Sequence, residues 1–387
     1  MNRDTIKVLM IGADDAPGGV ANYINTIISQ LKGRALMFDL AVPVPRADNP
    51  YFSAAFAKHV LPIDYGACAL SKRVRQLKQL IVQERIDVVH AHTARAGLLA
   101  ALVSQDIRRP FIYTGHGWRF EQKTAPPARY VFRELERYVC RRAAACTFLS
   151  NRERCVGINS KLVVPERAFV INTRIDHRPF VGEKAPQKRS LRAEWNIPEN
   201  AFLIGNVGAV DERKDPFLFI RIASKVVALN PGAYFLWIGG GPLHDHAEAY
   251  AQKYRLTNRI VFTGYKRPSE MPRFLAALDA FLFTSRAEGV PLAVIEANLS
   301  GVPVASARYS GVDDAIIDGV TGWLFDRDDE TRAVAALLEI AAGGQQIDSL
   351  RVRAHDRALE EHSRPEHMAA EFEILYRRVT AETLPHA

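Results

Sequence analysis

The sequence is poor in cysteine and lacks the cysteine spacings of metal or redox sites. Its four cysteines are Cys68, Cys140, Cys146 and Cys155. None of them forms a CxxC pair, so we expect reduced thiols in the core or at the surface rather than metal ligands.

Long hydrophobic runs are also missing. The longest candidate, residues 274–283, contains Asp279 and falls well short of the 18 or so apolar residues that span a membrane. The apolar run at 8–11 is too short for a signal-peptide core and is followed by no cleavage site. These absences predict a cytoplasmic protein, soluble or bound peripherally to the inner membrane.

The composition is that of a globular protein with an uneven charge distribution. The chain has 387 residues, of which 48% are hydrophobic and 24% charged, so two or three domains are expected. Residues 1–180 hold 27 Lys and Arg against 15 Asp and Glu, a net charge of +12, whereas the remainder carries −4. A basic first half favours an anionic partner, although a solvated surface without a role is the alternative. No nucleic-acid-binding motif accompanies this charge, so nucleic acid is not an expected partner.

Short β-branched runs alternate with helical stretches along both halves of the chain. Strands are predicted at 7–11, 38–42, 88–90, 111–113, 147–149 and 169–171, and again at 202–207, 234–238, 260–263, 280–283 and 302–305. Helices are predicted at 20–31, 70–84, 94–103, 129–142, 217–229, 244–254, 293–300 and 365–382. This alternation predicts two doubly wound α/β domains, joined by a polar linker at 181–190.

A glycine pair follows the first predicted strand. Gly18 and Gly19 precede a predicted helix, whose N-terminal amides suit a phosphate. The segment is not GxGxxG and has no acidic ribose anchor, which argues against a dinucleotide dehydrogenase. A plain strand-to-helix turn remains the alternative.

Two carboxylates flank the start of the helix predicted at 293–300. Glu288 precedes it, Pro291 suits its first turn, and Glu296 lies one turn inside. The expected free amides are those of Val290, Leu292 and Ala293. Hydrogen-bond acceptors beside an anion-binding helix start match the needs of a nucleotide sugar.

This Glu-x7-Glu segment and its neighbours resemble the C-terminal half of a family 4 retaining glycosyltransferase. Further matching motifs are Gly301-x-Pro303, Ser310-Gly311, Asp318-Gly319-x-Thr321-Gly322, Asp87-Val-Val-His90-Ala-His92 and Tyr113-Thr-Gly-His116-Gly117. The resemblance covers nearly the whole chain. It implies the GT-B fold, with an acceptor-binding Rossmann-like domain at 1–180, a donor-binding domain at 191–364, a cleft between them, and a C-terminal helix at 365–387 packed back on the first domain.

The resemblance also implies a chemistry. A metal-independent hexosyl- or N-acetylhexosaminyltransferase would use a UDP- or GDP-linked sugar as substrate, without a cofactor. The acceptor would be a lipid-diphosphate-linked saccharide in bacterial exopolysaccharide or cell-surface polysaccharide synthesis. A nucleotide-sugar epimerase and a non-catalytic nucleotide-sugar-binding protein are the alternatives.

Residue roles follow from the same resemblance. Catalytic roles are implied for His116 and Glu288, and donor-binding roles for Gly18, Gly19, Arg213, Lys214, Gly241, Tyr265, Val290, Pro291, Leu292 and Glu296. Lys214 would stabilise charge on the departing diphosphate.

Two positions depart from the family pattern. Where the family usually has an arginine, this chain has Ala209, so either Arg213 replaces it or the diphosphate is held less tightly. Arg174 stands near a position where the family commonly has glycine, and it is open whether it faces the cleft or solvent.

Basic helices in the first half extend the charge argument to a membrane. Lys72, Arg73, Arg75 and Lys78 lie on one predicted helix, and the helix at 129–142 interleaves arginines with aromatic residues. An anionic inner-leaflet surface is one expected partner, and solvated helix faces are the alternative.

Overall fold

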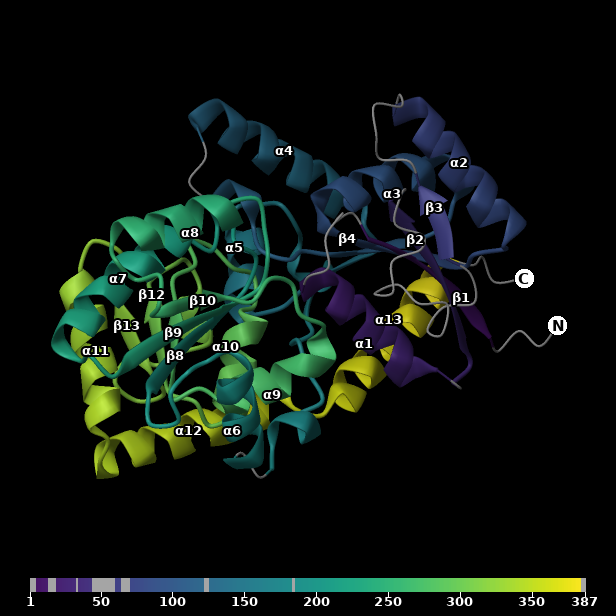
Figure 1. Ribbon diagram of the computed structural model, residues 1–387. Helices are drawn as coiled ribbons and strands as arrows, with labels where there is room; N and C mark the ends of the chain where they lie inside the picture. The colour runs from purple at the N-terminus through teal and green to yellow at the C-terminus, as the bar shows by residue number, and fades with distance from the viewer. Residues whose placement is uncertain are drawn as a thin grey trace. The chain divides into compact units, whose positions relative to one another are not determined.

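The structure, a computed structural model, describes residues 5–12, 19–32, 34–43, 60–63, 70–121, 125–182 and 185–383 (Figure 1). The chain divides into two compact units, the first comprising residues 1–175 and 364–387 and the second residues 176–363. No helix in the described ranges is long and apolar enough to cross a membrane.

The first unit is built on a parallel sheet in the order β3-β2-β1-β4-β5-β6-β7. Its strands are β1 (Ile6–Ile11), β2 (Leu36–Pro43), β3 (Val60–Ile63), β4 (Val88–His92), β5 (Phe111–Thr114), β6 (Ala145–Phe148) and β7 (Ala168–Val170). Its helices are α1 (Gly19–Leu31), α2 (Leu70–Gln83), α3 (Thr93–Ile107), α4 (Pro126–Arg142), α5 (Asn151–Asn159) and α13 (Pro365–Thr383). Strand β4 is buried along its whole length, as expected for a central strand covered by helices on both faces.

All paired strands of this sheet are parallel, but the order in which they follow one another across the sheet reverses between the neighbours β1 and β4. From β1, the next strands β2 and β3 are added toward one edge of the sheet, whereas β4 to β7 are added toward the other edge. Such a switch point is where doubly wound sheets place ligands, beyond the carboxyl ends of the strands.

The C-terminal helix α13 belongs to the first unit, where it packs on α1. Phe372 and Tyr376 on its inner face are fully buried, and the Tyr376 hydroxyl lies 2.7 Å from Nδ1 of His90. A segment nearly three hundred residues downstream of β4 therefore completes the core around that strand.

The second unit contains a parallel sheet in the order β10-β9-β8-β11-β12-β13. Its strands are β8 (Phe202–Val207), β9 (Ala233–Ile238), β10 (Ile260–Phe262), β11 (Ala280–Phe283), β12 (Val304–Ala307) and β13 (Trp323–Phe325). Its helices are α6 (Ala185–Glu194), α7 (Pro216–Leu229), α8 (His244–Lys253), α9 (Met271–Ala276), α10 (Leu292–Leu299), α11 (Glu330–Ala342) and α12 (Gln345–His362).

Strand β11 shows how the core of this unit is divided. Ala280 and Leu282 pack into one hydrophobic cluster, and Phe281 and Phe283 into another on the opposite face. This alternation follows from the two-residue period of a strand, and burial of both faces explains the continuous apolar sequence. The two predicted doubly wound α/β domains are thus confirmed.

The predicted linker at 181–190 differs from the structure. Helix α6 begins at Ala185 and is counted in the second unit, whose first residue is Asp176. The polar composition that suggested a linker belongs to the exposed face of this helix, while Leu191 and Arg192 are buried.

Arg192 on α6 is a buried cation that joins three segments of the second unit. Its guanidinium is 2.7 Å from an oxygen of Asp279, and it donates to the carbonyls of Glu199 and Ala201 at 2.6 and 2.7 Å. Removing Arg192 leaves the carbonyls of Glu199 and Ala201 without this donor, which typically costs about 1–3 kcal/mol for a buried group, while Asp279 keeps its ion pair with Lys188.

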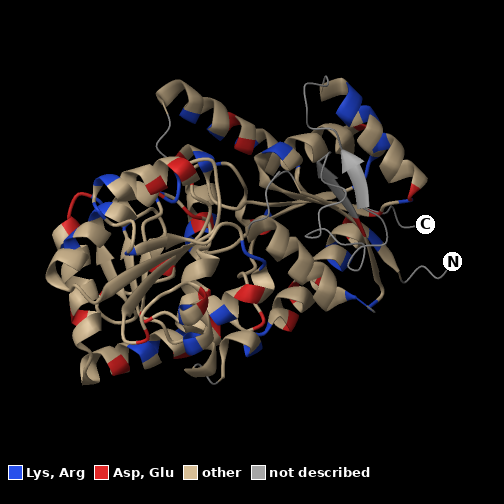
Figure 2. Cartoon of the chain, viewed as in Figure 1, with Lys and Arg blue, Asp and Glu red and all other residues tan. Residues whose placement is uncertain are grey.

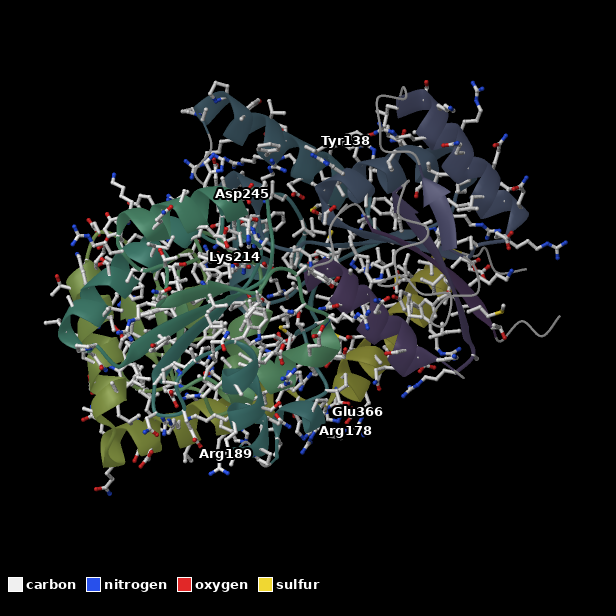
Figure 3. The ribbon with its side chains drawn as sticks, in the orientation of Figure 1. Tyr138, Arg178, Arg189, Lys214, Asp245 and Glu366 are labelled. Atoms are coloured by element: carbon white, nitrogen blue, oxygen red, sulfur yellow. The ribbon has the colours of Figure 1, made fainter. Side chains whose placement is uncertain are left out.

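We therefore expect Arg192→Met to lower the free energy of unfolding of the second unit by about 3 kcal/mol. Urea unfolding followed by tryptophan fluorescence measures the change. The control is Arg189→Ala on the same helix, whose ion pair with Glu199 is mostly exposed and should contribute under about 1 kcal/mol (Figure 3). Equal effects of the two substitutions would contradict the assignment.

Candidate functional site

The clearest group of polar side chains in the second unit lies at its switch point. The sheet order changes direction between β8 and β11, and the segments that follow these strands carry Lys214 and Glu288. We call Arg213, Lys214, Ser285 and Glu288 the switch-point cluster. Figure 3 labels Lys214 among the strands of this unit.

Glu288 is held by two cations, one at each carboxylate oxygen. Lys214 Nζ is 2.7 Å from Oε1, and Arg213 Nη1 is 2.9 Å from Oε2. The Ser285 hydroxyl also donates to Oε1. The side chains of Lys214 and Glu288 are about nine-tenths buried, whereas that of Arg213 is 46% exposed.

The protonation states of this cluster follow from burial and charge. Burial lowers the pKa of Lys214, and the attraction of Glu288 opposes this effect. Burial alone would raise the pKa of Glu288, but Lys214 and Arg213 outweigh it and hold that pKa below its usual range. At neutral pH the cluster is a carboxylate bound to two cations.

Backbone contacts between the two loops fix the cluster. The Arg286 amide donates to the Arg213 carbonyl at 2.7 Å, and the Thr284 hydroxyl donates to the Lys214 carbonyl at 2.8 Å. These two hydrogen bonds join the loop after β8 to the loop after β11 beside Lys214 and Glu288.

Asp215 and Arg327 support this arrangement, although neither was among the expected site residues. Asp215 caps α7 by accepting from the Leu218 amide, and its backbone is left-handed, with a φ of 51°. Its other oxygen pairs with Arg286 at 2.6 Å and with Arg327. The only sequence signal was an aspartate directly before Pro216, the usual position of a helix cap.

The glycine turn after β9 packs directly on the loop after β8. An added Cβ at Gly239 would lie 2.1 Å from the Gly208 oxygen, and one at Gly241 would lie 2.5 Å from the Val210 oxygen. The Trp237 indole donates to the Gly208 carbonyl at 2.9 Å and closes the contact. Tyr265, which is half exposed, lies in the next loop, beside Gly240.

Gly241→Ala is expected to destabilise the second unit by about 1–3 kcal/mol, because the obstructing atoms belong to the backbone and cannot rotate away. The control is Gly232→Ala, whose Cβ would meet only a side-chain oxygen, that of Asn230, at 3.3 Å. Thermal denaturation of both variants checks this. A midpoint for Gly241→Ala as high as that for Gly232→Ala would contradict the close approach.

Helix α10 begins at Leu292, a few residues after Glu288. Of the amides expected to be free at its start, that of Leu292 is not. The Leu292 amide donates to the Val290 carbonyl at 3.0 Å and is therefore already used. Glu296 is partly buried on α10, no described group hydrogen-bonds to its carboxylate, and burial raises its pKa to about 7.

Tyr309 is a further residue that sequence reasoning missed. It follows β12, packs edge-on against Phe283 at a centroid distance of 6.2 Å, and is buried. Lys214 lies 4.7 Å from the centre of the same Phe283 ring. The Tyr309 hydroxyl has no hydrogen-bond partner among the described residues.

In the first unit, three histidines gather at the carboxyl ends of β4 and β5, and we call them the histidine cluster. They are His90, His92 and His116. His90 is fully buried between the Tyr376 hydroxyl and Thr114 Oγ1, at 2.7 and 2.6 Å. Nδ1 of His92 lies 3.2 Å from Nε2 of His116.

All three histidines have a lowered pKa because burial disfavours the charged imidazole. The pKa is about 3 for His90 and about 4 for His116, and that of His92 is well below its usual value. The histidine cluster is therefore neutral at physiological pH.

The remaining expected positions of the first unit are only partly described. Gly19 is the first residue of α1, whereas Gly18 lies outside the described residues. Arg174 is partly buried and lies near Glu371 of α13. Burial raises the pKa of Glu371, and the positive charge of Arg174 only partly offsets this effect. In the described part of the chain, no three His, Cys, Asp or Glu side chains gather in a way that suits a metal ion.

Comparisons with known families cover most of the chain. The family "Glycosyl transferases group 1" matches residues 187–358, and "Glycosyl transferase 4-like domain" matches residues 18–171. The two matches fall on the second and first unit respectively.

Individual proteins agree with this result. An Escherichia coli UDP-Gal:α-D-GlcNAc-diphosphoundecaprenol α-1,3-galactosyltransferase is 26% identical over 70% of this chain and 70% of its own. The Vi polysaccharide biosynthesis protein VipC/TviE of Salmonella typhi is 33% identical over 32% of this chain and 21% of its own. The crystal structure of Anabaena HepE with UDP and glucose superposes with a TM-score of 0.81, covering 96% of this chain and all of that one, at 18% identity. The chain belongs to the glycosyltransferases, and its two α/β units are those of the GT-B fold.

Proposed function

We propose that this glycosyltransferase transfers a sugar, with retention of configuration, from a nucleotide sugar to a lipid-diphosphate-linked saccharide in the synthesis of a bacterial surface polysaccharide. The acceptor class is supported by the galactosyltransferase relative, whose name specifies a diphosphoundecaprenol-linked sugar. The polysaccharide setting is supported by the Vi polysaccharide relative. A nucleotide donor agrees with the UDP and glucose bound to the structurally similar HepE.

The observation that carries the proposal is the pairing of Lys214 and Arg213 around Glu288. A nucleoside diphosphate leaving group needs positive charge on its phosphate oxygens as the bond to the sugar breaks. Lys214 and Arg213, each within 3 Å of the Glu288 carboxylate, place two positive charges in one site, as a diphosphate requires. They supply this charge without a metal ion, and Arg213 compensates for the arginine that Ala209 replaces.

In this proposal Glu288 occupies the cation site until the donor arrives. The diphosphate then takes over Lys214 and Arg213, and the released carboxylate accepts hydrogen bonds from the hydroxyls of the donor sugar. Glu296 accepts from the ribose, and His116 contacts the sugar near the reacting carbon. Donor-binding roles are also proposed for Gly241, Tyr265, Val290, Pro291 and Leu292 of the second unit, and for Gly18 and Gly19 of the first.

A donor screen followed by a transfer assay tests the proposal. Thermal shift against UDP-, GDP- and ADP-sugars should identify a stabilising donor, since a ligand at 100 times its Kd adds about 2.7 kcal/mol. Transfer to a lipid-diphosphate saccharide should then proceed in the presence of EDTA, and proton NMR of the product should show the anomeric configuration of the donor. Donor binding without transfer would favour a non-catalytic nucleotide-sugar-binding protein. Turnover of the donor without an acceptor would favour an epimerase. A product with inverted anomeric configuration would exclude a retaining mechanism.

We also propose that the first unit contacts an anionic inner-membrane surface. Lys72 and Arg75 are exposed on α2, and Tyr130 and Val131 on α4 are 68% and 61% exposed. Figure 2 shows the basic residues along α2 in blue. Each basic residue near an anionic leaflet contributes about 1 kcal/mol. Co-sedimentation with phosphatidylglycerol vesicles but not with phosphatidylcholine vesicles is expected, and Lys72→Glu with Arg75→Glu should weaken it. Equal binding to both vesicle types would contradict the proposal.

A further inference from the structure

His92 and His116 form a hydrogen-bonded pair whose direction affects the chemistry at the end of β5. Their ring centres are 5.5 Å apart, and Nδ1 of His92 faces Nε2 of His116 at 3.2 Å. Tyr23 of α1 packs edge-on against both rings, at 5.9 and 5.2 Å. His90 also lies beside His92, at a centroid distance of 4.2 Å. The His92 ring therefore packs against three other rings, those of Tyr23, His90 and His116.

Each ring of the pair carries one N–H, because both histidines are neutral at physiological pH. Burial lowers the pKa of His116 to about 4, and burial with the neighbouring histidines lowers that of His92 further. A neutral imidazole has one donor nitrogen and one acceptor nitrogen. Either His92 donates to His116 or His116 donates to His92, and each direction fixes the tautomers of both rings.

The second nitrogen of His92 decides between the two directions. His92 is fully buried, and its Nε2 has no hydrogen-bond partner among the described residues. If His116 donated, Nε2 of His92 would be an unpaired buried N–H. If His92 donates from Nδ1, Nε2 carries only an unpaired lone pair. Orphaned buried N–H groups are the rarer case in proteins, so donation from His92 is favoured.

We infer that His92 is a positioning residue that donates from Nδ1 to Nε2 of His116 and thereby holds His116 as its Nδ1–H tautomer. His116 is half-buried, and no described residue hydrogen-bonds to its Nδ1. Nδ1 of His116 is then a hydrogen-bond donor, suited to an oxygen of a bound sugar or phosphate. It has no lone pair to act as a general base.

The backbone supports a fixed position for His92. The chain passes from β4 into α3 without a loop, and Thr93 at this junction has a φ of 76°. A β-branched residue rarely adopts this left-handed conformation. Strain of this kind persists only where the surroundings impose it, and it is common beside functional groups.

Histidine tautomers are measured directly by NMR on the full-length protein. Long-range proton–nitrogen correlation of 15N-histidine-labelled protein at pH 7, with His116 assigned from a His116→Gln variant, distinguishes the two ring nitrogens. We expect a protonated Nδ1 and an unprotonated Nε2 for His116. A protonated Nε2 on His116 in the wild-type protein would overturn the inference.

Two substitutions at His92 separate positioning from packing. His92→Asn retains an N–H donor near the position of Nδ1 and should preserve the Nδ1–H form of His116. His92→Ala removes the donor and should shift His116 toward its Nε2–H form. His246→Ala, on the exposed surface of α8, is the control and should change neither tautomer nor stability. An unchanged His116 tautomer in His92→Ala would overturn the inference.

The expected effect of His92 substitutions on sugar transfer rests on the proposed function, whereas the NMR measurement of the His116 tautomer does not. His92→Ala should reduce kcat/KM for the donor by roughly 10- to 100-fold, and His92→Asn should recover most of the loss. Equal losses in both variants would indicate packing alone and contradict positioning. If the wild-type protein transfers no sugar but shows the Nδ1–H form, the proposed function fails and the tautomer assignment stands.

Discussion

Replacing Lys214 with alanine should lower kcat/KM for sugar transfer by about 10²- to 10³-fold. A single preorganised charge-stabilising donor typically contributes this much to a transition state in which negative charge develops. Lys214 is about nine-tenths buried, so bulk water screens its charge only weakly. Steady-state kinetics with varied donor concentration measures the effect, which should fall mainly on kcat because the phosphate charge develops during bond cleavage.

The loss in Lys214→Ala should occur without unfolding. Glu288 keeps the Arg213 and Ser285 contacts, so its carboxylate is not left unpaired. The matched control is Lys225→Ala, which removes a half-exposed lysine paired with Glu330 in the same unit. Kinetics of Lys214→Ala close to those of Lys225→Ala would remove Lys214 from the mechanism.

Glu288→Gln should change donor binding and transfer in opposite directions. The Glu288 carboxylate is paired with both cations, and in the proposed mechanism the diphosphate displaces it from them. A neutral amide is displaced more easily, and we expect the free nucleoside diphosphate to bind about tenfold tighter, or ~1.4 kcal/mol. Transfer should nevertheless fall about 10²-fold, because the amide is a weaker acceptor for the sugar hydroxyls. Isothermal titration calorimetry and kinetics measure the two effects separately.

The chain offers a close control for this substitution. Glu330, the first residue of α11, is also held by two cations, Arg221 at 2.6 Å and Lys225 at 2.8 Å, and neither of them belongs to the switch-point cluster. Glu330→Gln removes the same charge from the same kind of pairing and should alter neither binding nor transfer. Weaker nucleotide binding in Glu288→Gln would contradict the displacement step and indicate local damage instead.

Most of the fold could be predicted from local patterns. Strands β8 and β11 coincide with their predictions, and the eight predicted helices agree with the structure to within a few residues. These elements are apolar runs or strongly amphipathic segments, in which local periodicity and burial point to the same structure. The elements that were not predicted are β3, β13, α5, α6, α9, α11 and α12. Two of them, α11 and α12, are long helices of 13 and 18 residues with a buried apolar face, which the prediction missed. Helix α6 resembled a linker because most of its residues face solvent.

The candidate site was predicted in part. Lys214 and Arg213 both contact the carboxylate of Glu288, which lies 75 residues after Arg213 in the sequence. Arg327, Asp215 and Tyr309 were overlooked, because their roles depend on contacts between loops that one sequence does not specify. The Leu292 amide was expected to be free and is not, since a tight turn at Val290 uses it.

The residue order of this chain determined two α/β domains, the placement of glycines and charges after particular strands, and the family resemblance. These properties are local, because hydrophobic periodicity and turn chemistry act over a few residues. Only the tertiary structure decided that Glu288 is bound by both cations and that His92 faces His116. It also decided that the C-terminal helix supplies Tyr376 to His90. Each of these contacts joins segments brought together by strand order, and strand order is set by the packing of the whole sheet.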